Sequence, residues 1–225
     1  MNKILLSYAI GNNTPFYIGT TEPSITPTTQ IKDGDDYNTY IVKVGNHCGT
    51  HVDAPKHFID TGRPILEYGL DELSFKDPLI LNCPKGPHEL VEIKDLELVD
   101  LREYQAVLFK TGFGKYRESD LSKYLTQNPG ISFETVKHIR KNYPNIKCLG
   151  IDSISISRYQ DDENAKKTHI TAFKDFDEYG DPLLLIEDMD LSGLSDLNTI
   201  DEMLIVPWQI IGVDSAPCTV VAVLK

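Results

Sequence analysis

Long apolar runs, paired cysteines and excess positive charge are all missing from this sequence. No stretch approaches the ~18 consecutive apolar residues of a membrane span, so we expect no membrane partner. The cysteines form no C-x-x-C pair and are typical of reduced thiols in a cytoplasmic protein; they are Cys48, Cys83, Cys148 and Cys218. The formal net charge of −12 argues against a nucleic-acid partner, which would require a basic surface.

The beginning of the chain also lacks the features of an export signal. Its apolar run in "MNKILLSYAI" is short, and no small-residue cleavage site follows. We therefore predict a first strand there. With 225 residues, 40% of them hydrophobic, and no internal repeat or low-complexity segment, the chain is expected to form one domain over residues 1–225.

Short β-rich segments dominate the local pattern. Each mixes apolar and β-branched residues between Gly, Pro or Asn; the segments are 38–44, 78–83, 106–111, 147–157, 182–187 and 218–224. A helix is predicted over 132–144 with Ser132 as its N-cap, and shorter helices or turns over 94–100 and 118–128. The polar tract 158–167 is expected to be an exposed loop. This order predicts an α/β domain with a mixed, partly antiparallel sheet.

The segment "HCGTHVDAPKHF", residues 47–58, holds three of the six histidines. Glycine and β-branched residues disfavour a helix here. In an extended segment His47, His51 and Asp53 share one face, and Pro55 can turn His57 back towards them. Two imidazoles and a carboxylate on one face can chelate Zn²⁺ or Mn²⁺. The alternative is a set of solvated residues at a strand end, but this density of ligands favours a metal site.

Further ligands must come from elsewhere, because four from one strand and turn would crowd a single ion. His169 follows the polar tract, and Glu187 ends an apolar strand where a carboxylate must be exposed, paired or bound to metal. The spacing alone does not show whether either residue is a metal ligand, since isolated acids and histidines are usually structural. His88, in a Gly-Pro turn, and His138, off the apolar helix face, are predicted to be surface residues without a role.

The same segment resembles the H-x-G-T-H-x-D-x-P-x-H-F signature of the cyclase-family metal-dependent hydrolases, which include bacterial kynurenine formamidases and isatin hydrolases. The match to the signature is complete. The resemblance extends over nearly the whole chain, through segments 14–19, 107–116, 150–157, 183–194 and 207–223. It implies a swivelling β/α/β-type fold and a homodimer or higher homo-oligomer.

The resemblance also implies a site with two divalent ions, zinc or in some cases manganese. Carried over to this sequence, His47, His51 and Asp53 hold the first ion, with Asp53 bridging to the second. The second ion is then held by two further residues, His169 and Glu187. In this scheme the remaining signature histidine, His57, is a catalytic proton shuttle and not a ligand.

Several positions depart from the family pattern. The aromatic residue that faces the substrate is Tyr17 where the family has Trp, and Ile18 replaces the following proline. Leu5 replaces an early acid, and the stretch between His169 and Glu187 is longer than usual. Tyr17 is still expected to line the substrate pocket, but these changes weaken any claim to one particular substrate.

The implied reaction is hydrolysis of a small amide by a metal-activated water, with His57 as general base and then general acid. An aryl formamide, the substrate type of the arylformamidases of tryptophan catabolism, is the leading instance. A cyclic amide, imide or lactone hydrolase is the alternative. A non-catalytic metal- or ligand-binding protein of the same fold is less favoured, because it would not need an unligated histidine. A cupin is excluded because no H-x-H pair is followed by a spaced Glu.

Overall fold

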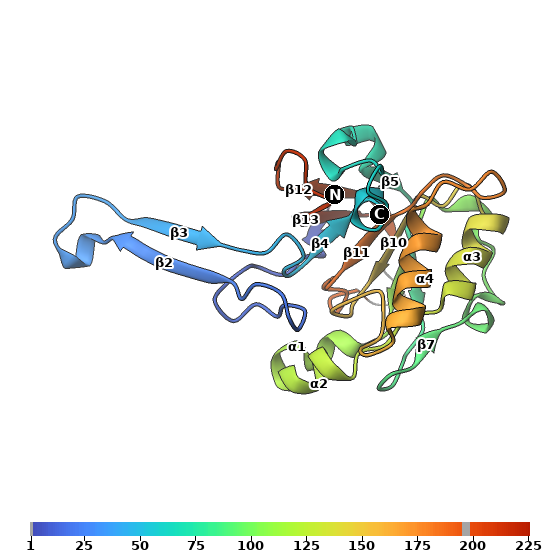
Figure 1. Ribbon diagram of the computed structural model, residues 1–225, viewed down its shortest axis with the longest axis horizontal. Coiled ribbons are helices and arrows are strands. Elements are labelled where there is room, and N and C mark those ends of the chain that lie inside the picture. Colours follow the sequence, from blue (N-terminus) through green and yellow to red (C-terminus); the bar gives the residue numbers. More distant parts are fainter. Residues whose placement is uncertain (1, 195–198) are drawn as a thin grey trace.

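The computed structural model describes residues 2–194 and 199–225, in which strands form one large sheet with helices beside it (Figure 1). The strands are β1 (Asn2–Leu5), β2 (Ser24–Thr29), β3 (Thr39–Lys43), β4 (His51–Asp53), β5 (Ser74–Lys76), β6 (Leu79–Asn82), β7 (Leu90–Val91), β8 (Ala106–Lys110), β9 (Gly130–Ile131), β10 (Cys148–Ile151), β11 (Leu184–Glu187), β12 (Ile200–Pro207) and β13 (Ser215–Leu224). The α-helices are α1 (Tyr116–Ser119), α2 (Leu121–Thr126), α3 (Phe133–Asn142) and α4 (Asp162–Phe173).

The large sheet is parallel in one half and antiparallel in the other. Its order is β5-β12-β13-β4-β11-β10-β8-β6, and β1 pairs with β13. Strands β6, β8, β10 and β11 run parallel, whereas β4 pairs antiparallel with both β11 and β13. The expected α/β class with a mixed, partly antiparallel sheet is confirmed. Strand β4 lies where the two halves meet.

Alternate side chains of the parallel strands enter two different cores. On β8, Val107 and Phe109 belong to a buried cluster with α3 and α4, while Ala106 and Leu108 belong to a second cluster. The second cluster also takes in side chains of β4, β12 and β13, so the curled sheet encloses it. This two-sided burial follows from the period of two along a strand and explains the nearly unbroken apolar runs of the parallel half.

The local predictions hold for most elements and are wrong at two places. Ser132 caps α3 through the backbone N–H of Thr135, as expected. The predicted strand 147–157 ends at Ile151. The polar tract 158–167 is not simply a loop, because α4 begins inside it at Asp162, with the side chain of Asp161 as N-cap. The acidic residues of the tract suit a first helical turn.

Two further features lie outside the large sheet. Strands β2 and β3 form a hairpin of their own, which extends far from the rest of the molecule (Figure 1). Strands β7 and β9 form a short parallel pair. Among the described residues no helix has both the length and the apolar character needed to cross a membrane.

Candidate metal centre

Strand β4 carries the centre of the site. It lies between β11 and β13, in a register that pairs His51 with Glu187 and Asp53 with Ser215. Both His51 and Asp53 are almost completely buried. A short strand held on both sides by neighbours leaves its side chains little freedom, so the two ligand-type groups are fixed in place.

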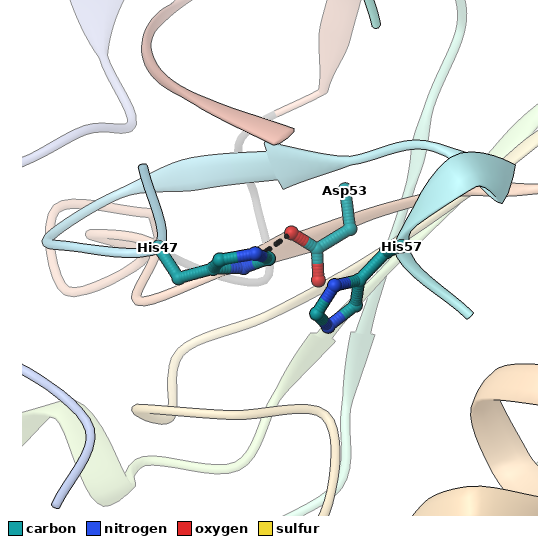
Figure 2. A group of neighbouring side chains, drawn as sticks. All are labelled: His47, Asp53 and His57. Atoms are coloured by element: carbon teal, nitrogen blue, oxygen red, sulfur yellow. Dashed lines mark ion pairs between the residues drawn. The ribbon is translucent and has the colours of Figure 1, made fainter. Parts of the chain in front are cut away.

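His47 reaches the same place by a different route from the predicted one. It lies in a turn before β4, and Gly49 in that turn has a φ of +67°. A left-handed residue interrupts an extended segment, so the prediction that His47 shares a strand face with His51 is wrong. The side chain nevertheless points to the strand: its Nδ1 lies 3.0 Å from Oδ1 of Asp53 (Figure 2).

His57 is returned to the site by the turn that the sequence predicted. Pro55 opens a 3₁₀ helix, Pro55–His57, directly after β4. Proline suits the first helical position because its φ is already set. Nδ1 of His57 lies 2.7 Å from Oδ2 of Asp214, and the same oxygen lies 2.9 Å from Nε2 of His47. A carboxylate can only accept, so both imidazoles donate to Asp214.

Glu187 and His169 join the cluster from β11 and α4. Nε2 of His51 lies 3.4 Å from Oε2 of Glu187, and Nε2 of His169 lies 3.9 Å from Oε1. The hydroxyl of Ser155 and the backbone N–H of Ile156 both donate to Oε1 of Glu187. These two donors orient the carboxylate and leave Oε2 facing His51.

The tautomers of the two most buried histidines follow from their partners. Nδ1 of His51 lies 2.8 Å from the carbonyl of Gly49, and Nδ1 of His169 lies 2.8 Å from the carbonyl of Ala165. Since a carbonyl only accepts, each Nδ1 carries the proton. In the neutral imidazoles both Nε2 lone pairs then face the carboxylates of the cluster. Metal-binding histidines are commonly oriented in this way.

Unpaired buried atoms test whether these residues fit a cation. Within the described part of the chain, Nε2 of His51 and both carboxylate oxygens of Asp53 are buried and accept or donate no hydrogen bond of good geometry, although Nδ1 of His47 lies 3.0 Å from Oδ1 of Asp53. Leaving such atoms without a partner is costly, and a cation would satisfy all three. Among the described residues, two groups have ligand atoms mutually within 4.8 Å, and Asp53 belongs to both; they are His47, Asp53, His57 and His51, Asp53, Glu187. The donor set therefore fits a divalent metal.

The pKa values of the cluster without metal also indicate a site for a cation. Burial alone lowers the pKa of His47, but the neighbouring carboxylates of Asp214 and Asp53 raise that pKa to about 10. Burial raises the pKa of Asp53, yet the charges of His51 and His47 outweigh it and hold this pKa well below its usual range. Burial lowers the pKa of His169. In the metal-free protein, protons on the histidines therefore offset the negative charge of the carboxylates, as a bound cation would.

Asp214 is a site residue that the sequence reasoning missed. It precedes β13, and besides the two histidines its Oδ1 accepts a hydrogen bond of 2.8 Å from Nδ2 of Asn46. Ser215 in turn donates to the carbonyl of Asn46. The only signal was a single acid before an apolar strand, which is too common to mark a site.

Tyr17 lies half-buried, and burial followed by the charge of Glu187 raises the pKa of its phenol. The neighbouring Phe16 pairs through its backbone with Cys48 in the signature segment. The phenol is therefore within electrostatic reach of the cluster. His88 is exposed and His138 lies at the surface, as predicted.

A separate cavity of about 810 Å³ lies beyond the carboxyl ends of β6 and β8, and none of the clustered histidines lines it. Two of the cationic side chains that line it are held in ion pairs: Lys85 pairs with Asp95, and Arg117 with the buried Asp188. The groups of His, Asp and Glu that could hold a metal lie at β4 and not in this cavity.

Comparison with known proteins gives the family. Residues 4–158 match the family model described as "Putative cyclase". An uncharacterized protein of Haemophilus influenzae is 36% identical over 125 residues, which are 55% of this chain and 88% of that protein. The kynurenine formamidase of Bacillus cereus is 22% identical over 184 residues, covering 75% of this chain and 76% of that enzyme.

Solved structures share the fold over almost the entire chain. An isatin hydrolase bound to the product analogue thioisatinate has a TM-score of 0.79 at 17% identity, over 99% of this chain and 92% of that one. A potential metal-dependent hydrolase with cyclase activity has a TM-score of 0.76 at 21% identity, over 98% and 96%. At these identities the likeness establishes the fold alone.

Proposed function

The chain belongs to the cyclase family, and from that premise we propose that it is a metal-dependent hydrolase of a small amide. The observation that carries the proposal is the buried carboxylate of Asp53, whose two unpaired oxygens lie among histidines on one side and Glu187 on the other. If Asp53 had a purely structural role, its buried oxygens would lack partners, and burying them would cost free energy of folding.

In this proposal two divalent ions, zinc or alternatively manganese, would be held by Asp53 together with four further residues. His47 and His51 complete the first set, and His169 and Glu187 the second. A divalent cation in such a site lowers the pKa of water and polarises a carbonyl group. The short hydrogen bonds of His51 and His169 to backbone carbonyls support this assignment, because they present Nε2 as the ligand atom.

His57 is proposed to move the proton. With its Nδ1–H donated to Asp214, its Nε2 is left as the acceptor. That nitrogen can take a proton from the attacking water and return it to the leaving amine. Asp214 is a positioning residue in this scheme, since it fixes the tautomer and the ring orientation. The side chain of His57 is a quarter exposed, which gives a substrate access to it.

An aryl formamide is the proposed substrate. Its anilide-like leaving group is poor enough to need both an electrophile and an acid. The likeness to a kynurenine formamidase supports this class and would place the activity in tryptophan catabolism. The ring of Tyr17, at the edge of the cluster, could stack on the aryl group and donate a hydrogen bond.

Hydrolysis of a cyclic amide is the second candidate, favoured by the shared fold with an isatin hydrolase. Both reactions cleave a C–N bond next to an aromatic ring, so the same cluster could serve either. They differ in whether the amine leaves the site or stays attached to the product.

The test is a metal analysis of the purified protein, followed by rate measurements on a panel of aryl formamides and cyclic amides with each metal restored. We expect up to two equivalents of metal and turnover of an aryl formamide that a chelator abolishes. The Asp53→Ala variant is the control for activity from contaminants. Turnover confined to cyclic amides would select the second candidate, and full activity without metal would refute the proposal.

A further inference from the structure

Starting from the proposed function, in which Glu187 is a metal ligand, we propose that the buried ion pair of Arg117 and Asp188 positions this ligand. Arg117 belongs to α1, and Asp188 directly follows Glu187 at the end of β11. The side chain of Asp188 is completely buried, and that of Arg117 is 8% exposed. Charged groups are almost never buried so deeply unless they are paired, and this pair lies next to a ligand of the metal centre.

Two residues outside the sheet hold the carboxylate of Asp188 in one orientation. Nε of Arg117 lies 2.8 Å from its Oδ1, and Nη2 lies 2.9 Å from its Oδ2, which is the two-pronged contact of a guanidinium with a carboxylate. The hydroxyl of Tyr124, in α2, donates to Oδ1 at 2.5 Å. Helices α1 and α2 lie together, apart from α3 and α4 (Figure 1). The side chain that follows Glu187 is therefore tied to this pair of helices.

The backbone of Asp188 connects this fixed side chain to the metal centre. Its carbonyl accepts a hydrogen bond of 2.5 Å from the hydroxyl of Thr50, the residue before His51. Its N–H donates to the carbonyl of Ser153 at 2.8 Å, at the start of the segment whose next residues hold the carboxylate of Glu187. Asp188 therefore contacts the chain on both sides of the contact between His51 and Glu187.

The backbone conformation of Asp188 is strained. Its φ is +51°, in the left-handed region that residues other than glycine seldom adopt. Such a conformation persists only where the surrounding structure holds it, and it is frequent at functional sites. Here the strand ends, and Glu187 faces His51 while the next side chain faces Arg117. Without the ion pair this strain can relax, and the relaxation moves Glu187 relative to His51.

The contribution of the pair to folding can be separated from its effect on Glu187. Removing one partner leaves the other charge buried and unpaired, which is strongly destabilising. Replacing both charges by neutral side chains of similar size often leaves stability unchanged or higher, because neither charge then loses its hydration. A double variant therefore keeps the fold but lacks the two-pronged contact. If the pair positions Glu187, metal binding stays weak in that variant.

Zinc titration of the full-length protein against a chromophoric chelator tests the proposal, with the melting temperature of the metal-free protein measured beside it. The wild type is expected to bind up to two equivalents. Arg117→Met should weaken the binding of the ion at Glu187 on the order of 10–100-fold, the usual effect of removing a group that orients a ligand, and should lower the melting temperature. Arg117→Met/Asp188→Asn should regain the melting temperature and still bind zinc weakly.

Asp95→Asn is the matched control, because it breaks the ion pair with Lys85, which follows β6 at the edge of the large sheet. It should bind zinc as tightly as the wild type. A double variant with wild-type affinity would make the Arg117–Asp188 pair purely structural and overturn the proposal, and so would equally weak binding by Asp95→Asn. A wild type that binds no zinc would instead refute the proposed function, and the positioning of Glu187 with it.

Discussion

At the scale of single residues, Asp214 links the two more exposed histidines of the cluster. One oxygen accepts hydrogen bonds from both His47 and His57, and Asn46 holds the other oxygen. Their ring centroids are 4.2 Å apart. The carboxylate therefore sets how both rings face Asp53, and a change at Asp214 should disturb binding and proton transfer together. The proposed proton transfer by His57 can be tested separately from metal binding.

Replacing His57 by Asn should leave metal content unchanged and lower kcat. His57 is proposed as a proton shuttle, and removal of a general acid–base group costs on the order of 10²–10⁴ in rate. Elemental analysis and kcat measured on one preparation check this. Because His57 also lies within ligand distance of His47 and Asp53, loss of metal along with activity would make it a ligand. Full activity with full metal would exclude the proposed proton transfer.

Metal binding to the metal-free protein should release protons. Because the carboxylates of Asp214 and Asp53 outweigh the effect of burial, His47 has a pKa of about 10, so it is protonated at pH 7–8. A cation that takes its nitrogen must displace that proton. Affinity should then rise with pH up to about 10, by as much as tenfold per pH unit from this group. Calorimetry in buffers with different ionisation enthalpies counts the protons, and pH-independent binding would contradict the prediction.

Ligands close to the signature segment in the sequence were easier to predict than ligands far from it. His51, Asp53 and His57 lie within one strand and one turn, so alternation and proline geometry already bring them together. Glu187 joins them only through the pairing of β11 with β4, which no local pattern reveals. His169 likewise depends on how α4 packs. Both were assigned from the family resemblance, and Asp214 had no signal to set it apart.

At the scale of elements, the buried strands were the readiest to predict, because their apolar runs are bounded by turn residues. The sequence did not predict the helix α4, for a physical reason: it is polar over its first turns and buries mainly Thr168, His169, Ala172 and Phe173 near its end. Its start depends on the cap at Asp161, which resembles any polar loop. The segment after β10 was read as strand, but its Ser155 and Ile156 instead turn to hold Glu187.

That segment gives a prediction at Gly130, on β9. A Cβ at this position would lie 2.8 Å from the carbonyl oxygen of Ile156 and against the backbone of Arg158. Gly130→Ala should therefore push the segment that orients Glu187 and destabilise the fold by about 1–3 kcal/mol, the usual cost of overpacking. Gly11→Ala is the control, since nothing lies within 4 Å of its added Cβ. Equal denaturant midpoints for the two variants would refute this account.

At the scale of the whole molecule, the candidate centre connects both halves of the sheet. Its residues come from the strand β4 at the junction, from β11 in the parallel half, and from the segment just before β13 in the antiparallel half. Asp53 and Glu187 are buried carboxylates in a chain with a net charge of −12. A cation placed between them would offset repulsion at the point where the two halves join, so stability and metal content should be coupled.

Removal of metal should therefore lower the melting temperature of the entire domain. A ligand that binds only the folded state stabilises it by about 4 kcal/mol at 1,000 times its Kd, which corresponds to a shift on the order of 10 °C for a chain of this size. We expect a chelator to produce such a fall, and added zinc or manganese to reverse it. Asp53→Ala should melt at one temperature with and without chelator, because the shared ligand is gone. If the chelator leaves the melting temperature of the wild type unchanged, no cation joins the two halves of the sheet.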